Sequence, residues 1–170
     1  MKYRIADDEK KGRIVIATAD LEMGEVVCVG MATRFVEQRD RFSVQIDDDV
    51  HVYINSPAVV FSHSCAWNLA LRDNAFSGFD FVATRPIARG EELSWYYGMS
   101  EAESISVPVC HCGSPNCLGR SFGFREATDA LQARLLEEGV AAHLRRWWYS
   151  RNTRVGAPTT LRDATFAWPE

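Results

Sequence analysis

Three short stretches of the sequence decide the fold and the site: FSHSCAWN (residues 61–68), GEELSWYYG (residues 90–98) and CHCGSPNCLG (residues 110–119). The first holds one cysteine, Cys65, with no second cysteine near it in the chain. The last holds three cysteines in the pattern C-x-C-x4-C. Between them lies a stretch with two adjacent tyrosines followed by a glycine. We expect the cysteines to come together over a pocket into which one tyrosine points.

The four cysteines fit the ligand set of a structural zinc ion. Such sites take four thiolate or imidazole ligands at the corners of a tetrahedron, with each sulfur about 2.3 Å from the metal. Cys110, Cys112 and Cys117 are close enough in sequence to supply three ligands, and Cys65 is the candidate for the fourth. Free thiols or a disulfide are the alternative interpretation, and two nearby histidines are competing ligands.

Composition indicates a soluble globular domain. The 170 residues are 46% hydrophobic and 25% charged, which allows one domain with a real core and a tail. No apolar run is long enough to span a membrane, and the charged N-terminus is not a secretory signal. Five cysteines then suggest thiols or metal ligands in a reducing compartment, cytoplasmic or, in a eukaryotic cell, nuclear. The net charge of −4 argues against direct nucleic-acid binding and suits a cationic partner such as a lysine-bearing protein.

Short apolar runs separated by turns predict a mostly β domain. Residues 42–46 and 50–54 alternate between apolar and polar around an acidic turn, which predicts an antiparallel hairpin. The other expected strands cover residues 13–18, 25–30, 69–72, 79–85 and 92–97.

The pattern changes after residue 124. Apolar residues at helical spacing predict one helix over 126–138 and a second short helix from Val140 to Trp147. We expect the aromatic cluster of residues 147–149 to pack back on the β core. Residues 150–170 show little periodicity and are expected to form an irregular tail.

Trp95-Tyr96-Tyr97-Gly98 is the second group of residues that carries chemistry. A tyrosine is a weak acid with an ordinary pKa of about 10, and in a closed pocket its hydroxyl can hold an amine or polarise a reacting centre. The alternative is that it only packs, as a tyrosine near a turn commonly does. The sequence offers no Gly-rich phosphate loop, no G-x-S-x-G elbow and no H-E-x-x-H helix.

Together these segments resemble a SET domain with its cysteine-rich post-SET segment, the fold of protein-lysine methyltransferases. The family pattern runs N-H-x-C-x-P-N, then G-E-E-L-x-[FY]-D-Y, then C-x-C-x4-C, and the three stretches follow it in that order. Upstream, Lys11-Gly12-Arg13 and Met23-Gly24-Glu25 resemble the family's opening cofactor segment. The likeness covers about residues 10–125. It implies a mostly β fold, the β-clip fold of short strands with a pseudoknot. The chain would then divide into a SET domain (1–105), a zinc-bound post-SET segment (106–125), a C-terminal helical segment (126–149) and the tail (150–170).

The resemblance also implies a reaction and a site. S-adenosylmethionine would be the cofactor, structural Zn²⁺ the metal and Tyr97 the catalytic tyrosine. By position, the residues near the cofactor would be Gly12, Arg13, Ser62, His63 and Phe122, with Phe124 as an alternative to the last. The methyl acceptor would be a neutral lysine amine, so a dry channel must lower the ordinary lysine pKa of about 10.4.

Four positions depart from the family pattern. Ser62 replaces an asparagine, Trp67 a proline and Tyr96 an aspartate, while Cys28 stands where the substrate channel usually has an aromatic residue and would widen it. These departures leave three functions open. The chain could methylate a lysine of a protein, methylate a small amine or metabolite, or serve as a non-catalytic binding module.

Overall fold

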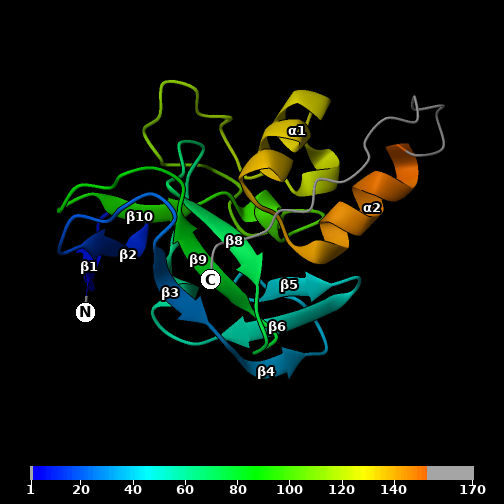
Figure 1. Cartoon of the computed structure of the whole chain (residues 1–170), viewed down its shortest axis with the longest axis horizontal. Coiled ribbons are helices and arrows are strands. Elements are labelled where there is room, and N and C mark those ends of the chain that lie inside the picture. The colour runs from blue at the N-terminus through cyan, green and yellow to red at the C-terminus, as the bar shows by residue number, and fades with distance from the viewer. Residues whose placement is uncertain (1, 153–170) are drawn as a thin grey trace.

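Ten strands and two α-helices make up residues 2–152, which the computed structural model describes (Figure 1). The strands are β1 (Tyr3–Asp8), β2 (Gly12–Ala17), β3 (Val26–Gly30), β4 (Ala32–Val36), β5 (Val44–Asp47), β6 (Val50–Ile54), β7 (Ser62–His63), β8 (Leu69–Asp73), β9 (Phe79–Ala83) and β10 (Glu92–Trp95). The helices are α1 (Asp129–Glu138) and α2 (Ala142–Asn152), with 3₁₀ turns η1 (Ala58–Val60), η2 (Tyr97–Met99) and η3 (Phe124–Glu126). From residue 153 on, the expected tail lies outside the described residues.

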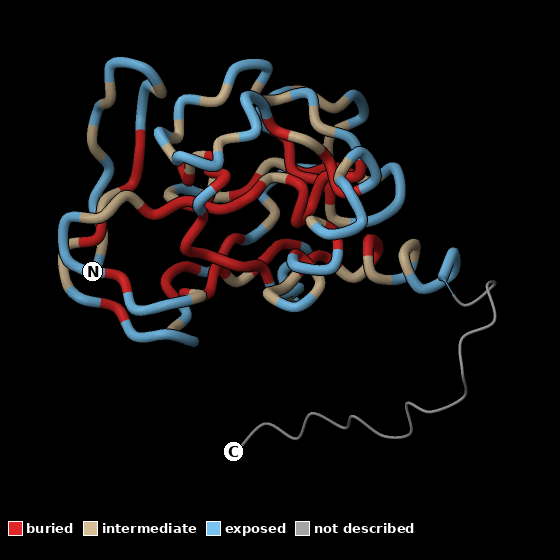
Figure 2. Tube along the Cα trace, turned by 90° about the horizontal axis from the view of Figure 1, so that it is seen from above, coloured by how far each residue is buried: buried red, intermediate tan, exposed pale blue. Residues whose placement is uncertain are grey.

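Two sheets enclose the core. The larger has the order β1-β2-β10-β8-β9-β3, with β7 paired to β10, and the smaller has the order β4-β6-β5. Val15, Leu69, Phe81 and Leu93 are fully buried, and burying each such side chain contributes about 1.5–3 kcal/mol. Figure 2 shows the buried stretches running through the middle of the molecule, with exposed loops around them.

The two strands that flank Cys65 both run parallel to β10. Trp95 of β10 pairs with His63 of β7 and with Leu69 of β8. Asn68 fixes the loop between them, because its side-chain amide donates to the β10 backbone at 2.9 Å and accepts from it at 3.0 Å. The cysteine segment is therefore held at the end of β10, immediately beside the tyrosine pair that follows this strand.

Most of the expected strands are confirmed, and the acidic hairpin is one of them. β5 and β6 pair antiparallel around the turn that contains Asp48 and Asp49. β1 and β4 were not expected. Both lie at the edge of a sheet and bury none of their residues, so they lack the apolar alternation that predicts a strand.

Both helices are present, with shifted bounds. α1 begins at Asp129, three residues later than expected, because residues 124–126 form a 3₁₀ turn. Thr128 caps α1, since its hydroxyl accepts a hydrogen bond from the Leu131 N–H at 3.3 Å. α2 begins at Ala142, whose N–H donates to the Asp73 carboxylate at 3.0 Å. It continues past the expected end at residue 147 to residue 152.

The aromatic cluster on α2 packs only in part as expected. Trp147 and Trp148 are partly buried against the core, and Trp147 meets Phe124 edge-on at 6.1 Å between ring centroids. Tyr149 is 56% exposed, so the expectation that it packs on the core is wrong. Successive helical residues point in different directions, so three in a row cannot all face the sheet.

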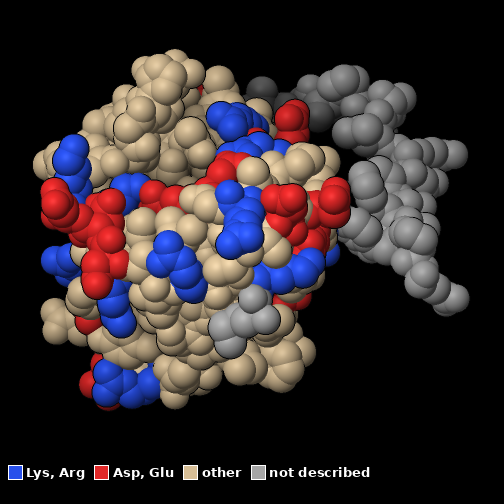
Figure 3. Space-filling view, turned by 90° about the vertical axis from the view of Figure 1, so that its left-hand side faces the viewer, with Lys and Arg blue, Asp and Glu red and all other residues tan. Residues whose placement is uncertain are grey.

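Charges of both signs are interspersed over the face that carries β1 and β2 (Figure 3). Within residues 2–152, no helix is both long and apolar enough to cross a bilayer. The division of the chain into four segments stays a prediction.

Candidate active site and metal centre

The four cysteines named by the sequence come together. Their sulfur atoms all lie within 4.8 Å of one another, and the Sγ atoms of Cys65 and Cys110 are 3.9 Å apart. In a tetrahedral zinc–thiolate site the sulfurs are about 3.8 Å apart, as bonds of about 2.3 Å require. Cys28 lies elsewhere, buried on β3. The donor set and spacing therefore fit a structural zinc ion.

The thiols of the cluster differ in pKa. Burial raises the pKa of Cys65 to about 11. Burial also acts to raise the pKa of Cys112, but hydrogen bonds from the backbone of Ser114 and Cys65 and from neighbouring thiols lower it to about 6. One sulfur thus takes up negative charge most readily. A bound cation removes the mutual repulsion that keeps the other sulfurs protonated.

His63 stands between the cysteine cluster and the tyrosine pair. It is 4% exposed, its Nε2 lies 3.7 Å from Cys65 Sγ, and its Nδ1 accepts a hydrogen bond from the Tyr97 N–H at 3.3 Å. Its ring also meets the rings of Tyr96 and Tyr97, with centroids 5.0 and 5.3 Å away. Burial, and then the charge of Lys11, lowers the pKa of His63 to about 4, so the ring is neutral at pH 7.

Tyr97 places its hydroxyl inside the fold. The hydroxyl donates a hydrogen bond to the Phe61 carbonyl oxygen at 3.1 Å, and burial raises the pKa of Tyr97 to about 12. Gly98, which follows, is needed for close packing. A Cβ atom there would lie 2.7 Å from the Phe122 carbonyl oxygen and 2.7 Å from the Tyr96 ring. The tyrosine pair and the post-cysteine segment can meet because this residue has no side chain.

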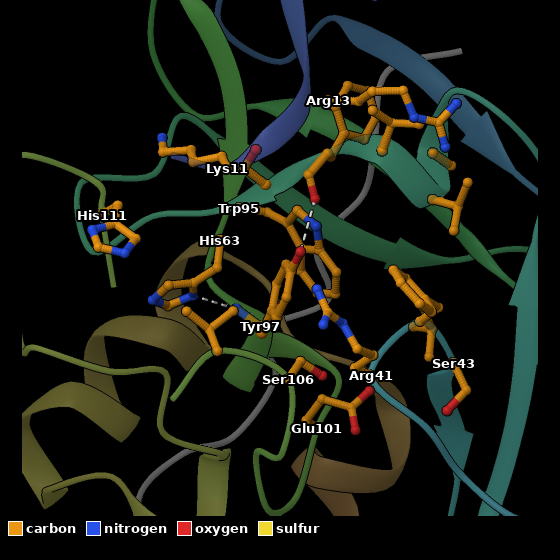
Figure 4. A pocket seen from close by; sticks show the side chains of 18 of the residues that line it. Lys11, Arg13, Arg41, Ser43, His63, Trp95, Tyr97, Glu101, Ser106 and His111 are labelled. Atoms are coloured by element: carbon orange, nitrogen blue, oxygen red, sulfur yellow. Dashed lines mark hydrogen bonds between the residues drawn. The ribbon is translucent and has the colours of Figure 1, made fainter. Parts of the chain in front are cut away.

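A cavity of about 490 Å³ opens beside Tyr97 (Figure 4). Its size is typical of a site for a small molecule. Trp95 forms part of the wall, and its buried Nε1 has no hydrogen-bond partner among the described residues. A buried, unpaired donor costs free energy unless a ligand or water accepts from it. The cavity is thus large enough for a small-molecule ligand.

Charged side chains surround the cavity. Lys11 pairs with Glu92 at 2.7 Å, whereas Arg41 forms no ion pair within the described part of the chain and lies over the Phe42 ring at 4.9 Å. Figure 4 shows Arg41 reaching toward Tyr97, with Glu101 beside it. Both side chains act on the pKa of Tyr97, Glu101 raising it and Arg41 lowering it.

Glu101 holds its carboxyl group in one place in this wall. It is 5% exposed and accepts a hydrogen bond from the Gln45 N–H at 2.8 Å. Its other oxygen lies 3.6 Å from His51 Nε2. The carboxylate therefore keeps one position, while Arg41 is exposed at the mouth.

Four of the expected site residues share the cavity: Arg13, Ser62, His63 and Tyr97 line it. Gly12 lies between two lining residues with φ at +79°, a left-handed conformation that favours glycine. Phe122 is half-buried under the Arg120 guanidinium at 4.0 Å and does not line the cavity. The roles assigned to these residues stay predictions.

The sequence missed several lining residues: Arg41, Phe42, Ser43, Glu101 and Ser106. None sits in a recognisable motif, and they meet only because the loop before β5 folds against the segment after η2. Trp95 and His111 also line the cavity, and both stood inside quoted stretches. Cys28 does not line this cavity, and its expected place on a substrate channel stays a prediction.

Comparison with known sequences decides the family. The SET domain family model matches residues 12–98, just over half of the 170 residues. The chain belongs to the SET-domain family. The match begins at Gly12 in β2 and ends at Gly98 beside the catalytic-tyrosine candidate, so it includes Arg13, His63 and Tyr97 of the cavity wall.

Two curated relatives of this SET domain are methyltransferases. Methyltransferase flvH of Aspergillus flavus is 29% identical over 92 residues, which cover 54% of this chain and 51% of the relative. The histone-lysine N-methyltransferase, H3 lysine-36 specific, of Candida albicans is 27% identical over 179 residues, covering 91% of this chain and 21% of the relative. The chain thus spans about half of the first and about a fifth of the second.

Solved structures share the SET fold. KRYPTONITE in complex with mCHG DNA and SAH matches with a TM-score of 0.58 at 22% identity, over 69% of this chain and 28% of that one. KRYPTONITE with mCHH DNA, an H3(1-15) peptide and SAH matches with a TM-score of 0.58 at 21% identity, over 71% and 29%. At these identities the likeness concerns the fold. It confirms the expected mostly β SET architecture.

Proposed function

We propose that this protein is an S-adenosylmethionine-dependent methyltransferase that acts on the side-chain amine of a lysine in a protein. The observation that carries the proposal is the Tyr97 hydroxyl, fixed on the Phe61 carbonyl oxygen in the wall of a SET-domain cavity. The relative that aligns with 91% of the chain is a histone-lysine methyltransferase, which supports a protein substrate.

The cavity residues fit the proposed cofactor. Arg13 and the neighbouring lysines offer positive charge for its carboxylate. Ser62 and His63 supply a backbone edge held by strand pairing with β10. When bound, S-adenosylmethionine would supply an electrophilic methyl group on a sulfonium.

The chain's own residues would orient the acceptor amine and keep it neutral. The Tyr97 hydroxyl donates its hydrogen to the Phe61 carbonyl oxygen. The lone pairs of the hydroxyl oxygen are therefore free to accept a hydrogen bond from an amine. The buried Phe61 and Trp95 keep water away from this point. A lysine ammonium loses its hydration there, which lowers its pKa and frees the lone pair that attacks. Alignment of the reacting atoms would supply most of the remaining acceleration.

Zinc would have a structural role in this proposal. Four thiolates fill a tetrahedral coordination sphere and leave no position for substrate. The ion would join Cys65 in the middle of the chain to the segment of Cys110–Cys117, and so close the cavity from one side.

Transfer of a radioactive methyl group tests the proposal. The full chain is incubated with labelled S-adenosylmethionine and either mixed histones or an amine-free buffer control. Label is expected on a lysine of protein, found by mass spectrometry, and should vanish with Tyr97→Phe. Absence of label on any protein, with S-adenosylhomocysteine still binding in calorimetry, would rule out the protein substrate.

A second candidate, methylation of a small amine that carries a carboxylate, is favoured by Arg41. Its guanidinium reaches toward Tyr97 without an acidic partner in residues 2–152 and would repel an approaching lysine ammonium. A carboxylate on the acceptor would satisfy it. Transfer of label to free amino acids but to no protein would establish this candidate instead.

The expectation that the chain makes no direct contact with nucleic acid stays a prediction. Both similar structures described above hold DNA, and the test is a mobility shift of duplex DNA at low salt, where no shift is expected.

A further inference from the structure

The side chain of His63 makes contacts that the backbone role proposed above does not use. The imidazole touches two groups that the proposed function treats separately, the metal-binding sulfur of Cys65 at 3.7 Å and the backbone amide of Tyr97 at 3.3 Å. Its own backbone is fixed independently, because β7 pairs with β10. The ring is 4% exposed, so water does not compete for either nitrogen.

The contacts determine which nitrogen carries the proton. Nδ1 accepts from the Tyr97 N–H and therefore carries no hydrogen of its own. In a neutral imidazole the hydrogen must then sit on Nε2, which faces Cys65 Sγ. Cys65 also accepts from the Leu118 N–H at 3.4 Å. Two N–H groups thus point at this sulfur, one from the His63 ring and one from the Leu118 backbone.

We infer that His63 is a positioning residue that couples metal binding by Cys65 to the placement of Tyr97. Cys65 as a zinc-bound thiolate is a stronger acceptor than a thiol, so zinc tightens the Nε2–H···S contact. The tightened ring holds its Nδ1 firmly on the Tyr97 amide. The metal then acts on the reaction site without touching substrate, as outer-shell partners of metal ligands commonly do.

Two substitutions separate the two ends of this contact. Asparagine in His63→Asn can place its amide oxygen near the Nδ1 position and keep an acceptor for the Tyr97 amide, but it offers nothing to the sulfur. Glutamine in His63→Gln can place its amide nitrogen near the Nε2 position and keep a donor for the sulfur, but it loses the acceptor. His111→Asn is the matched control, because His111 lies between two metal-binding cysteines but is exposed and outside the sulfur cluster.

Two measurements on the full chain test the inference, and neither needs cofactor or substrate. Zinc affinity is measured by competition with a chromophoric chelator, and hydrogen exchange of the Tyr97 amide is followed by NMR with and without zinc. In the wild type, zinc should slow Tyr97 exchange by about tenfold more than exchange of the core amide of Leu93, as one strengthened hydrogen bond predicts.

The variants should differ in opposite ways. His63→Asn should lose about 10–100-fold in zinc affinity while Tyr97 exchange no longer responds to zinc. His63→Gln should bind zinc within a few fold of wild type but exchange its Tyr97 amide faster. His111→Asn should match the wild type in zinc affinity. If zinc slows the Leu93 and Tyr97 amides equally, or His63→Asn binds zinc like wild type, the inference is overturned.

The inference rests on the proposed zinc site and on the proposed role of Tyr97. Its failure is distinguishable from failure of the methyltransferase proposal, because metal affinity and amide exchange are read without methyl transfer. The wild-type comparison alone remains decisive if neither His63 variant folds.

Discussion

The hydroxyl of Tyr97 donates to the carbonyl oxygen of Phe61 across 3.1 Å, although 36 residues separate them in the chain. This bond joins the turn after β10 to the segment before β7 in the wall of the cavity. It fixes the phenol in one rotamer. Tyr97→Phe should therefore lower kcat by at least about 100-fold, the cost expected when an acceptor is misplaced by about 1 Å. Single-turnover methyl transfer measures this directly.

Tyr96→Phe is the control for that substitution. Tyr96 is fully buried and does not line the cavity, so loss of its hydroxyl should leave kcat within a few fold of wild type. Tyr97→Phe should also cost only about 1 kcal/mol of unfolding free energy, the net value of one hydrogen bond. Equal loss of activity in the two variants would show that the tyrosine pair acts through packing.

Removal of the metal should destabilise the fold. A structural zinc ion contributes its binding free energy to folding, so a chelator should lower the thermal unfolding midpoint of the wild type. Cys65→Ser should reduce zinc affinity by more than about 100-fold, because it removes a direct ligand rather than an outer-shell partner. Cys28→Ala should keep one zinc per chain by elemental analysis, since Cys28 lies outside the cluster. Retention of zinc by Cys65→Ser would contradict the four-cysteine site.

Acid should weaken the fold through His63. Its pKa falls to about 4 in the fold from an ordinary 6.5, so the unfolded chain takes up a proton first as the pH drops. The neutral His63 ring contributes to the free energy of unfolding above pH 6.5, and this contribution is lost as the pH falls toward 4. It amounts to about 2 kcal/mol between pH 7 and pH 5. Urea unfolding at both pH values should show a larger loss in the wild type than in His63→Gln, which has no imidazole at this site.

Arg41→Ala should distinguish the two candidate substrates. For a protein lysine, removing the guanidinium relieves a repulsion beside Tyr97, so kcat/KM should rise or stay constant. For an amine that carries a carboxylate, kcat/KM should fall by about tenfold or more, because a charged hydrogen bond is lost. Phe42→Leu, next to Arg41 on the cavity wall, controls for changes in the shape of this loop.

Local chemistry allowed much of the fold and part of the site to be predicted. The cysteine spacing identified the four sulfurs that meet, and the tyrosine after β10 lines the cavity as expected. Alternating runs predicted the β5–β6 hairpin correctly. In each case the residue types and their spacing along the chain were enough to indicate which residues would come together.

Features that depend on tertiary contacts were not predicted. Glu101 became part of the cavity wall because the β5 backbone at Gln45 binds its carboxylate, 56 residues away. Arg41 lies outside every sequence motif, so nothing in the sequence pointed to it. The bounds of α2 depend on Asp73, which caps the helix across the fold. Periodicity and propensity contain no signal for such long-range contacts.

Trp67, which stands at the family's proline position, joins the cysteine segment to α1. Its ring lies 3.9 Å from the Arg134 guanidinium carbon, and its indole N–H donates to the Glu138 carboxylate. It also packs on Tyr96, with ring centroids 5.2 Å apart. Trp67→Phe should lose about 2 kcal/mol of unfolding free energy, because a hydrogen bond to a charged group disappears and the cation–π contact weakens.

A double-mutant cycle isolates the Trp67–Glu138 contact from the rest of the packing. Glu138→Gln retains an acceptor and should cost about 1 kcal/mol, while the double variant with Trp67→Phe should lose less than the sum of the two. The unfolding free energies come from urea titration of the zinc-loaded chain. Strict additivity would show that Trp67 only fills volume. A coupling of about 1 kcal/mol would show that the residue replacing the family's proline anchors α1 to the cysteine segment.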